Sequence, residues 1–183
     1  MKKSLCPLVV VLIACLPPLA HGQSYPSKPI RFIVGFPPGG TNDIVARLVA
    51  PKLGELLGQQ VVVDNRGGAN TAIACQLFVR TPPDGHTIML NAPGHATNPA
   101  LMKLSFDPIK DFSFVTLVAE SQNLLVVHPS LPARNVKELI ALSKKHPGVI
   151  NYGSSGIGTT VHLAIAPWAQ EGPFWVFLGG LVF

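Results

Sequence analysis

The chain has 183 residues, of which 48% are hydrophobic and 13% charged, so it can bury a substantial core, and its composition excludes a disordered chain. This length suits one ordinary domain or two small ones. The formal net charge is +5, but the basic residues are scattered and form no stripe, which argues against a nucleic-acid partner.

The first 22 residues have the pattern of a secretory signal peptide. Lys2 and Lys3 precede an apolar stretch, residues 5–16, which is too short to span a bilayer. Residues 20–22 (AHG) resemble a cleavage signal, which predicts a mature start near Gln23. A second interpretation is that residues 12–15 form a bacterial lipobox and that Cys15 becomes a lipidated N-terminus. Both interpretations predict an exported protein.

A short apolar stretch at residues 30–35 (IRFIVG) predicts a buried strand, and the helical spacing of residues 44–57 predicts a helix. Between them lies FPPGGTND, residues 36–43. Its glycines let the backbone come close to a ligand, and its last three residues are good N-caps. A helix start presents free N–H groups and positive partial charge, so this loop suits a carboxylate or phosphate. The same residues also fit an ordinary turn.

Strands and helices alternate along the next fifty residues. We expect a strand at 60–64, a turn at 65–68, a helix at 70–80 capped by Asn70 or Thr71, a turn at 81–85 and a strand at 87–91. This order predicts a parallel sheet covered on both faces, with loops 36–43, 65–70 and 91–97 at its ligand-binding edge. Cys75 lies in an apolar helical stretch and is interpreted as a small buried hydrophobe.

The second half predicts another α/β unit. Residues 92–99 read as a loop or short helix start, residues 106–112 as an irregular connection, and 114–119 and 123–128 as strands leading into a second lobe. A helix is expected at 136–145 with Asn135 as its N-cap, followed by a strand at 149–153.

A second loop, residues 154–162 (SSGIGTTVH), joins that strand to a helix beginning near Thr159 or Thr160. Hydroxyl groups and backbone N–H groups can surround a carboxylate with neutral donors. A flexible turn with a Ser/Thr cap is the alternative. Two such loops on two lobes would form a cleft that holds an anion without lysine or arginine.

Other classes of function lack their motifs. The GSSGI sequence at residues 153–157 fails the nucleophile-elbow pattern at its last position, and the histidines show no metal-ligand spacing. There is no phosphate loop and no dinucleotide-binding fingerprint. We therefore predict neither an enzyme nor a cofactor. A small hydrolase, or a membrane-anchored lipoprotein or interaction protein without solute binding, is the alternative to a binding protein.

Several motifs in order resemble the substrate-binding receptors of tripartite tricarboxylate transporters, the Bug or TctC-type periplasmic proteins. They include IRFIVGFPPGGTNDIVARLVAPKLGELLGQQVVVDNRGG, PPDGHTIML, FDPIKDFSFVTLVA and NYGSSGIGTTVHLA, and the match runs from Tyr25 to Ala164. The resemblance implies an α/β, type 2-like periplasmic-binding-protein fold with two lobes that close as a Venus flytrap. It also implies small carboxylates as ligands and transporter membrane subunits as partners.

In that family the loop matching residues 36–43 holds the distal part of the ligand, partly through waters, and the loop matching residues 154–160 binds a carboxylate. The ligand-binding candidates are therefore Phe36, Pro38, Gly39, Gly40, Thr41 and Asp43 in the first loop and Ser154, Ser155, Gly156, Gly158, Thr159 and Thr160 in the second.

Two departures from the family matter. Family members usually have NRPGAGG at the loop that here reads NRGGANT, residues 65–71, and they are roughly twice as long. The resemblance stops at Ala164, and Pro167 should disturb the helix expected there. We expect a signal peptide (1–22), an incomplete first lobe (23–122), a partial second lobe (123–164) and an aberrant hydrophobic tail (165–183). Incomplete lobes predict weak or absent ligand binding.

Overall fold

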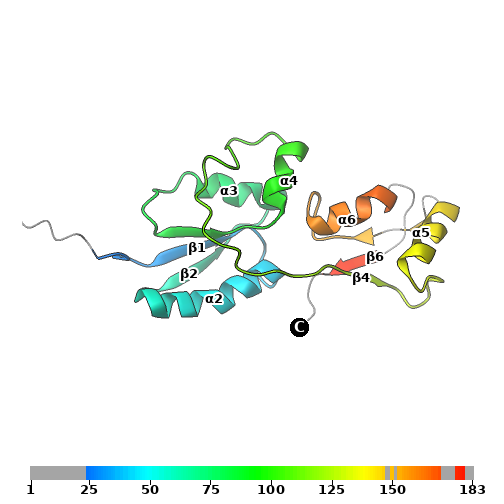
Figure 1. Ribbon diagram of the computed structural model, residues 1–183, viewed down its shortest axis with the longest axis horizontal. Coiled ribbons are helices and arrows are strands. Elements are labelled where there is room, and N and C mark those ends of the chain that lie inside the picture. The colour runs from blue at the N-terminus through cyan, green and yellow to red at the C-terminus, as the bar shows by residue number, and fades with distance from the viewer. Residues whose placement is uncertain (1–23, 147–148, 151, 170–175, 180–183) are drawn as a thin grey trace, which may run out of the picture.

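A computed structural model describes residues 24–146, 149–150, 152–169 and 176–179, with side chains described as far as residue 165. The predicted signal peptide and the candidate lipobox lie outside the described residues. The elements form two α/β lobes that lie side by side (Figure 1). The first lobe contains β1 (Ile30–Val34), α2 (Thr41–Leu57), β2 (Val61–Asn65), η1 (Ala69–Thr71), α3 (Ala72–Phe78), β3 (Thr87–Leu90) and α4 (Gly94–Leu101). The second contains β4 (Leu124–Val127), α5 (Val136–Lys145), β5 (Tyr152–Gly153), α6 (Thr160–Ala169) and β6 (Val176–Gly179).

The first sheet is parallel and has the strand order β2-β1-β3. Phe32 of the central strand β1 stands between Val63 of β2 and Ile88 of β3. Figure 1 shows α2 and α3 on opposite faces of this sheet. Phe32 and Val34 pack with Ala46 and Ala50 of α2, which places the apolar core under that helix. The predicted parallel sheet with helices on both faces is confirmed.

Helix α2 begins three residues earlier than the sequence pattern predicted. It starts at Thr41 with Gly40 as its N-cap, and no side chain caps it. The three polar residues expected to cap the helix lie instead in its first turn. Asp43 is turned back there so that its carboxylate accepts a hydrogen bond from the Gly39 N–H, at 2.8 Å. The carboxylate thus satisfies a backbone donor that precedes the helix.

The connection from α4 to the second lobe differs from the prediction. Residues 92–99, expected as a loop or short helix start, lead into α4, a helix of 8 residues. The strand predicted at 114–119 is wrong, because these residues form no strand and are exposed. A strand needs a neighbour to complete its backbone hydrogen bonds, and the described part of the chain places none beside this segment.

The second sheet has the order β4-β6-β5, with β6 antiparallel to β4 and parallel to β5. The hydrophobic core of the second lobe contains Leu139 of α5 together with Ile150, Val161 and Ile165. Strand β6 comes from the residues that the sequence analysis set apart as a tail, so the second lobe extends past the predicted boundary at residue 164. Helix α6 also runs through Pro167 to Ala169, contrary to the expected disturbance.

Helix α5 has the predicted bounds and the predicted cap. The Asn135 side chain accepts a hydrogen bond from the Glu138 N–H at 2.9 Å, and the Glu138 carboxylate accepts one from the Arg134 N–H at 2.7 Å.

We expect Asn135→Ala to lower the free energy of unfolding of the second lobe by about 1 kcal/mol, because the helix loses its N-cap. Chemical denaturation followed by far-UV circular dichroism measures this, and Asn135→Ser should recover most of the loss. An unchanged midpoint in Asn135→Ala would contradict the assignment.

Candidate functional site

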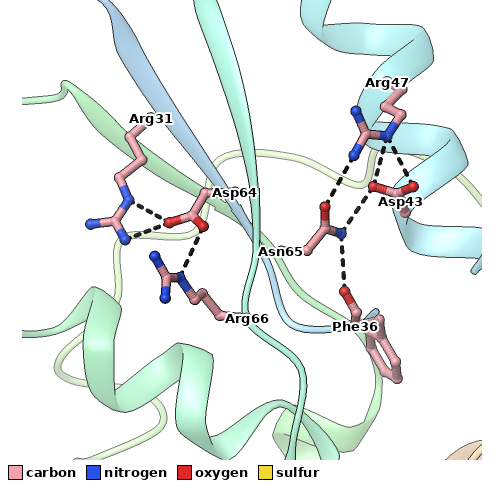
Figure 2. Close-up of polar contacts among 7 residues, drawn as sticks. All are labelled: Arg31, Phe36, Asp43, Arg47, Asp64, Asn65 and Arg66. Carbon is pink, nitrogen blue, oxygen red and sulfur yellow. Dashed lines mark hydrogen bonds and ion pairs between the residues drawn. The ribbon is translucent and has the colours of Figure 1, made fainter. Parts of the chain in front are cut away.

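The first loop is built around the carboxylate of Asp43, which is buried (Figure 2). One oxygen accepts hydrogen bonds from the Arg47 Nε and the Asn65 Nδ2, each at 2.9 Å. The other accepts from the Gly39 N–H and again from Arg47. Asn65 also donates to the Phe36 carbonyl at 3.0 Å, so the end of β2 is tied to the start of the loop.

These donors lower the pKa of the Asp43 carboxyl from its usual value to about 2. The largest contribution is the hydrogen bond from Arg47, followed by the Gly39 N–H; burial acts in the opposite direction, and Asn65 adds a smaller lowering. Asp43 in turn raises the pKa of Arg47. The loop therefore holds a permanent internal anion, and Arg47, although half-exposed, is engaged with it.

The remaining candidates of the first loop lie around this carboxylate. Pro38 and Gly39 are exposed, Gly40 and Thr41 are partly exposed, and Phe36 packs against the core under α2. Gly39 has φ +84°, a left-handed conformation that glycine adopts without strain. The surface that this loop offers to a solute is therefore mostly backbone, while the charged group of Asp43 points inward.

The chain that follows β2 lines the carboxyl edge of the first sheet. Gly67 lies against Pro37, and Thr71 lies against Gly35 and is 3.4 Å from Asn91, hydroxyl to side-chain oxygen. Ala69, Asn70 and Thr71 all have positive φ, at 45°, 48° and 75°. The loops that follow β1, β2 and β3 thus meet at the carboxyl edge of the sheet, as the alternation of elements predicted.

The second loop is held together by Thr159, which is buried. Its hydroxyl donates to the Gly156 carbonyl at 2.7 Å and accepts from the Ser155 hydroxyl and the His162 N–H, each at 3.2 Å. Thr159 therefore caps α6, which begins at Thr160 as the sequence predicted. The parts of the loop open to solvent are Ser155, Gly156, Ile157 and Thr160; Ser154 is partly exposed and Gly158 is buried.

The second loop contacts the first lobe through Gly158. The Thr97 hydroxyl donates to the Gly158 carbonyl at 2.9 Å, across 61 residues of sequence. A Cβ on Gly158 would overlap Leu101 and lie 3.0 Å from the Asn70 Nδ2, so only glycine fits this approach without displacement. Figure 1 shows the start of α6 next to α4. Both candidate loops therefore lie at the side of the first lobe that faces the second.

Asn70 and Asn98 lie at this contact, and sequence analysis did not select either as a site residue. Asn70 donates to the Asn98 side-chain oxygen at 3.0 Å, and Asn98 donates to the Asn70 carbonyl at 2.8 Å. The Asn70 Oδ1 is buried and has no hydrogen-bond partner in the described part of the chain. The one signal available was the departure from the family's glycines at residues 70–71.

A second acidic group, Asp64, lies near the same loops but forms a separate cluster (Figure 2). Burial alone would raise its pKa, but hydrogen bonds from Arg31 and Arg66 hold the pKa of this carboxyl below its usual value. The Arg31 Nε and the Arg66 Nε donate to it at 2.8 and 2.9 Å. Both arginines are therefore engaged with one carboxylate, which offsets one of their two positive charges.

Cys75 and His95 pack against each other inside the first lobe. His95 Nε2 is 2.6 Å from the Pro108 carbonyl, so this nitrogen carries the proton, and Nδ1 faces the Cys75 sulfur at 3.5 Å. Cys75 is fully buried, and burial raises the pKa of its thiol. Its interpretation as a buried small residue is confirmed. Within the described residues no group of histidine, cysteine and acidic side chains could hold a metal ion.

Among the described helices, none has the length and hydropathy needed to cross a bilayer. A shallow hollow of about 760 Å³ runs along α2 and β2, lined by Gly54, Gly58 and Val61 among others, and not between the two candidate loops. The contacts through Gly158 therefore place the candidate binding site at the edge between the lobes, and the hollow lies elsewhere.

Two α/β lobes that meet at the carboxyl edge of a parallel sheet, with glycine-rich loops on both sides, define a periplasmic-binding-protein fold. The chain belongs to the tripartite tricarboxylate transporter family receptors, whose family model matches residues 45–172. This family consists of solute-binding receptors rather than enzymes, which confirms the prediction that the chain is not an enzyme. The first candidate loop lies just before the matched residues.

Relatives support this assignment along most of the chain. A protein of Pseudomonas sp. (strain P51), named UPF0065 protein in tcbD-tcbE intergenic region, is 38% identical over 79% of this chain and 43% of its own length. Protein BugT of Bordetella pertussis is 33% identical and is covered over 54% of its length. The chain therefore spans about half the length of the curated relatives it matches.

Solved structures of the same fold also match most of this chain and only about half of their own length. The structure titled R. palustris Rpa4515 with adipate is 36% identical with a TM-score of 0.74, and the match covers 85% of this chain and 54% of that one. The MatC protein of Rhodopseudomonas palustris with bound malate is 25% identical with a TM-score of 0.65, covering 85% and 55%. A structure titled periplasmic transporter has a TM-score of 0.73 at 35% identity.

Proposed function

We propose that this chain carries the binding site of an extracytoplasmic receptor for small carboxylates that supplies a tripartite tricarboxylate-type transporter. The observation that carries the proposal is the contact of Gly158 with Thr97 and Asn70, which brings the second loop to the same edge as the first. Relatives of the same fold were solved with adipate and with malate, both small dicarboxylates. The partners would be the membrane subunits of such a transporter.

In this proposal the negative charge of the bound carboxylate is stabilised by backbone and hydroxyl dipoles rather than by lysine or arginine side chains. Neither residues 36–43 nor residues 154–162 contain lysine or arginine. The nearby arginines 31, 47 and 66 are bonded to Asp43 and Asp64. A carboxylate at this edge would meet the N-termini of α2 and α6 and the hydroxyl of Thr160. The Gly39 N–H, the Gly156 N–H and the Ser155 hydroxyl donate to Asp43, Ser154 and Thr159 in the structure, so they would bind a carboxylate only by exchanging these partners for it. Phe36, Pro38, Gly40, Thr41, Ser154, Gly158 and Thr159 would shape the loops around it, and Asp43 would hold the first loop in place.

Titration with adipate and malate, followed by the backbone amide resonances of the chain, tests this proposal. We expect saturable shifts at Gly39, Gly40, Gly156 and Thr160, with dissociation constants near or above about 1 mM, because each described sheet has only three strands to hold the lobes in place. Adipamide, which keeps the length but lacks the charge, should cause none.

Shifts of equal size with adipamide, or none with either acid, would reject a carboxylate site. Calorimetry on a monomeric sample gives the second measure, and micromolar affinity there would contradict the expected weak binding while leaving the site itself supported.

A further inference from the structure

The side chain of Asn70 fills the junction between the first lobe and the second candidate loop. A Cβ on Gly94, where α4 begins, would lie 2.3 Å from the Asn70 Oδ1, and a Cβ on Gly158 would lie 3.0 Å from its Nδ2. The carboxamide thus packs against the backbone of both segments and leaves no room beside it for a side chain on either glycine. Figure 1 shows α4 and the start of α6 side by side, so the carboxamide lies where the two lobes meet.

This carboxamide is held in one orientation. Its Nδ2 donates to the Asn98 Oδ1 at 3.0 Å, and the Asn98 Nδ2 donates back to the Asn70 carbonyl at 2.8 Å. The second bond fixes which atom of Asn98 is the oxygen, and that oxygen needs the donor that Asn70 supplies. Asn98 lies on α4 and is 1% exposed, so it cannot turn away and release its partner. A solute at this edge would therefore meet a side chain of fixed position and volume.

Two features of Asn70 act against the stability of the fold. Its backbone is left-handed, at φ 48° and ψ 50°, a conformation that costs free energy for residues other than glycine, although asparagine tolerates it better than most. Its Oδ1 is buried and accepts no hydrogen bond from any residue that the structure describes, which is unfavourable for a polar atom away from water. Backbone strain and unpaired buried groups persist where they serve a binding site. The contact with Gly158 indicates which site that is.

We propose that Asn70 is a specificity-determining residue whose carboxamide closes one end of the candidate site between the lobes. The site then accepts a short dicarboxylate, such as succinate, and rejects a longer one, such as adipate. A dicarboxylate held at the second loop would extend along the carboxyl edge of the first sheet, where a longer chain would overlap the fixed carboxamide. The unpaired Oδ1 adds to the rejection, because an acceptor repels a carboxylate instead of donating to it. The role of Asn70 rests on the proposed function, since it concerns the same site.

Titration with succinate and adipate, which differ only in length, tests this role when it is followed by the amide resonances of Gly156 and Thr160. We expect wild type to bind succinate about tenfold more tightly than adipate, because steric overlap rejects the longer acid. Asn70→Gly removes the carboxamide, and glycine adopts the left-handed backbone without strain. It should tighten adipate binding about tenfold and change succinate binding by less than about threefold, so that the preference disappears. A purely structural role of Asn70 would change both affinities by the same factor and leave their ratio unmoved.

Gln60→Ala is the matched control, because it removes an exposed side-chain amide at the opposite end of β2 and should leave both affinities unchanged. Far-UV circular dichroism establishes that each variant is folded. Asn70→Ser, which shortens the side chain and keeps a polar group, provides a second variant and should show an intermediate preference.

Two results would overturn the assignment of Asn70: equal binding of succinate and adipate by wild type, or a wild-type preference retained in Asn70→Gly and Asn70→Ser. Binding of neither acid to wild type would be a different failure. It would reject the proposed function itself, and the role of Asn70 with it.

Discussion

Replacing Asp43 with asparagine should lower the free energy of unfolding at neutral pH by about 2 kcal/mol. Both carboxylate oxygens accept hydrogen bonds, from Gly39, Arg47 and Asn65, and the group is buried. An amide keeps one acceptor but points an NH₂ group at donors, which leaves buried groups unpaired. The first loop and the start of α2 then lose the group that holds them together.

The same substitution changes how stability depends on pH. The folded pKa of Asp43, about 2, lies below the unfolded value of 3.8. Its contribution to stability is therefore complete above the unfolded pKa and is lost as pH falls through about 2. Wild type should lose stability between about pH 5 and pH 2, and Asp43→Asn should lose less over this range.

Urea denaturation at pH 7 and pH 3, followed by circular dichroism, measures both effects. Glu120→Gln removes one carboxylate from an exposed position and serves as the control, with a stability close to wild type at both pH values. An Asp43→Asn protein as stable as this control at pH 7 would show that the network around Asp43 contributes nothing.

The regular part of the first lobe could be predicted because its signals are local. Residues 30–35 are apolar apart from Arg31, as expected for a strand covered on both faces, and the polar residues after it mark a helix start. Parallel connections then place the loops after β1, β2 and β3 at one edge, so the position of the first candidate loop follows from element order alone. The cap at Asn135 was equally readable, because it depends on residues three positions apart.

The rest depended on contacts between distant residues. Residues 114–118 have strand composition, yet a strand also requires a partner, which local sequence does not supply. Strand β6 was missed because composition set the last residues apart, whereas their backbone pairs with β4. The inward turn of Asp43 depends on Asn65, 22 residues later, and the contact of Gly158 with Thr97 spans 61 residues.

Replacing Gly35 with alanine should destabilise the first lobe by about 3 kcal/mol. Gly35 follows β1 and is buried, and a Cβ there would lie 2.8 Å from both the Cβ and the Cγ2 of Thr71. These atoms cannot move aside, because Thr71 is fully buried and its backbone is left-handed at φ 75°, a conformation that a β-branched residue adopts only when its surroundings impose it. The close approach of Gly35 and Thr71 is therefore a rigid one.

The second substitution that tests this contact is Thr71→Gly, which restores one of the glycines that the family resemblance implies at this loop. Alone it should change stability by less than about 1 kcal/mol, because relief of the left-handed strain offsets the lost side-chain packing. In this background Gly35→Ala should cost less than about 1 kcal/mol, which gives a coupling energy of about 2 kcal/mol between the two positions. Denaturation of the four proteins of this cycle measures the coupling. Gly35→Ala could instead lower the free energy of unfolding equally with threonine and with glycine at position 71. The destabilisation would then not arise from overlap with the Thr71 side chain, and that side chain would have no part in shaping the sheet edge that carries the candidate loops.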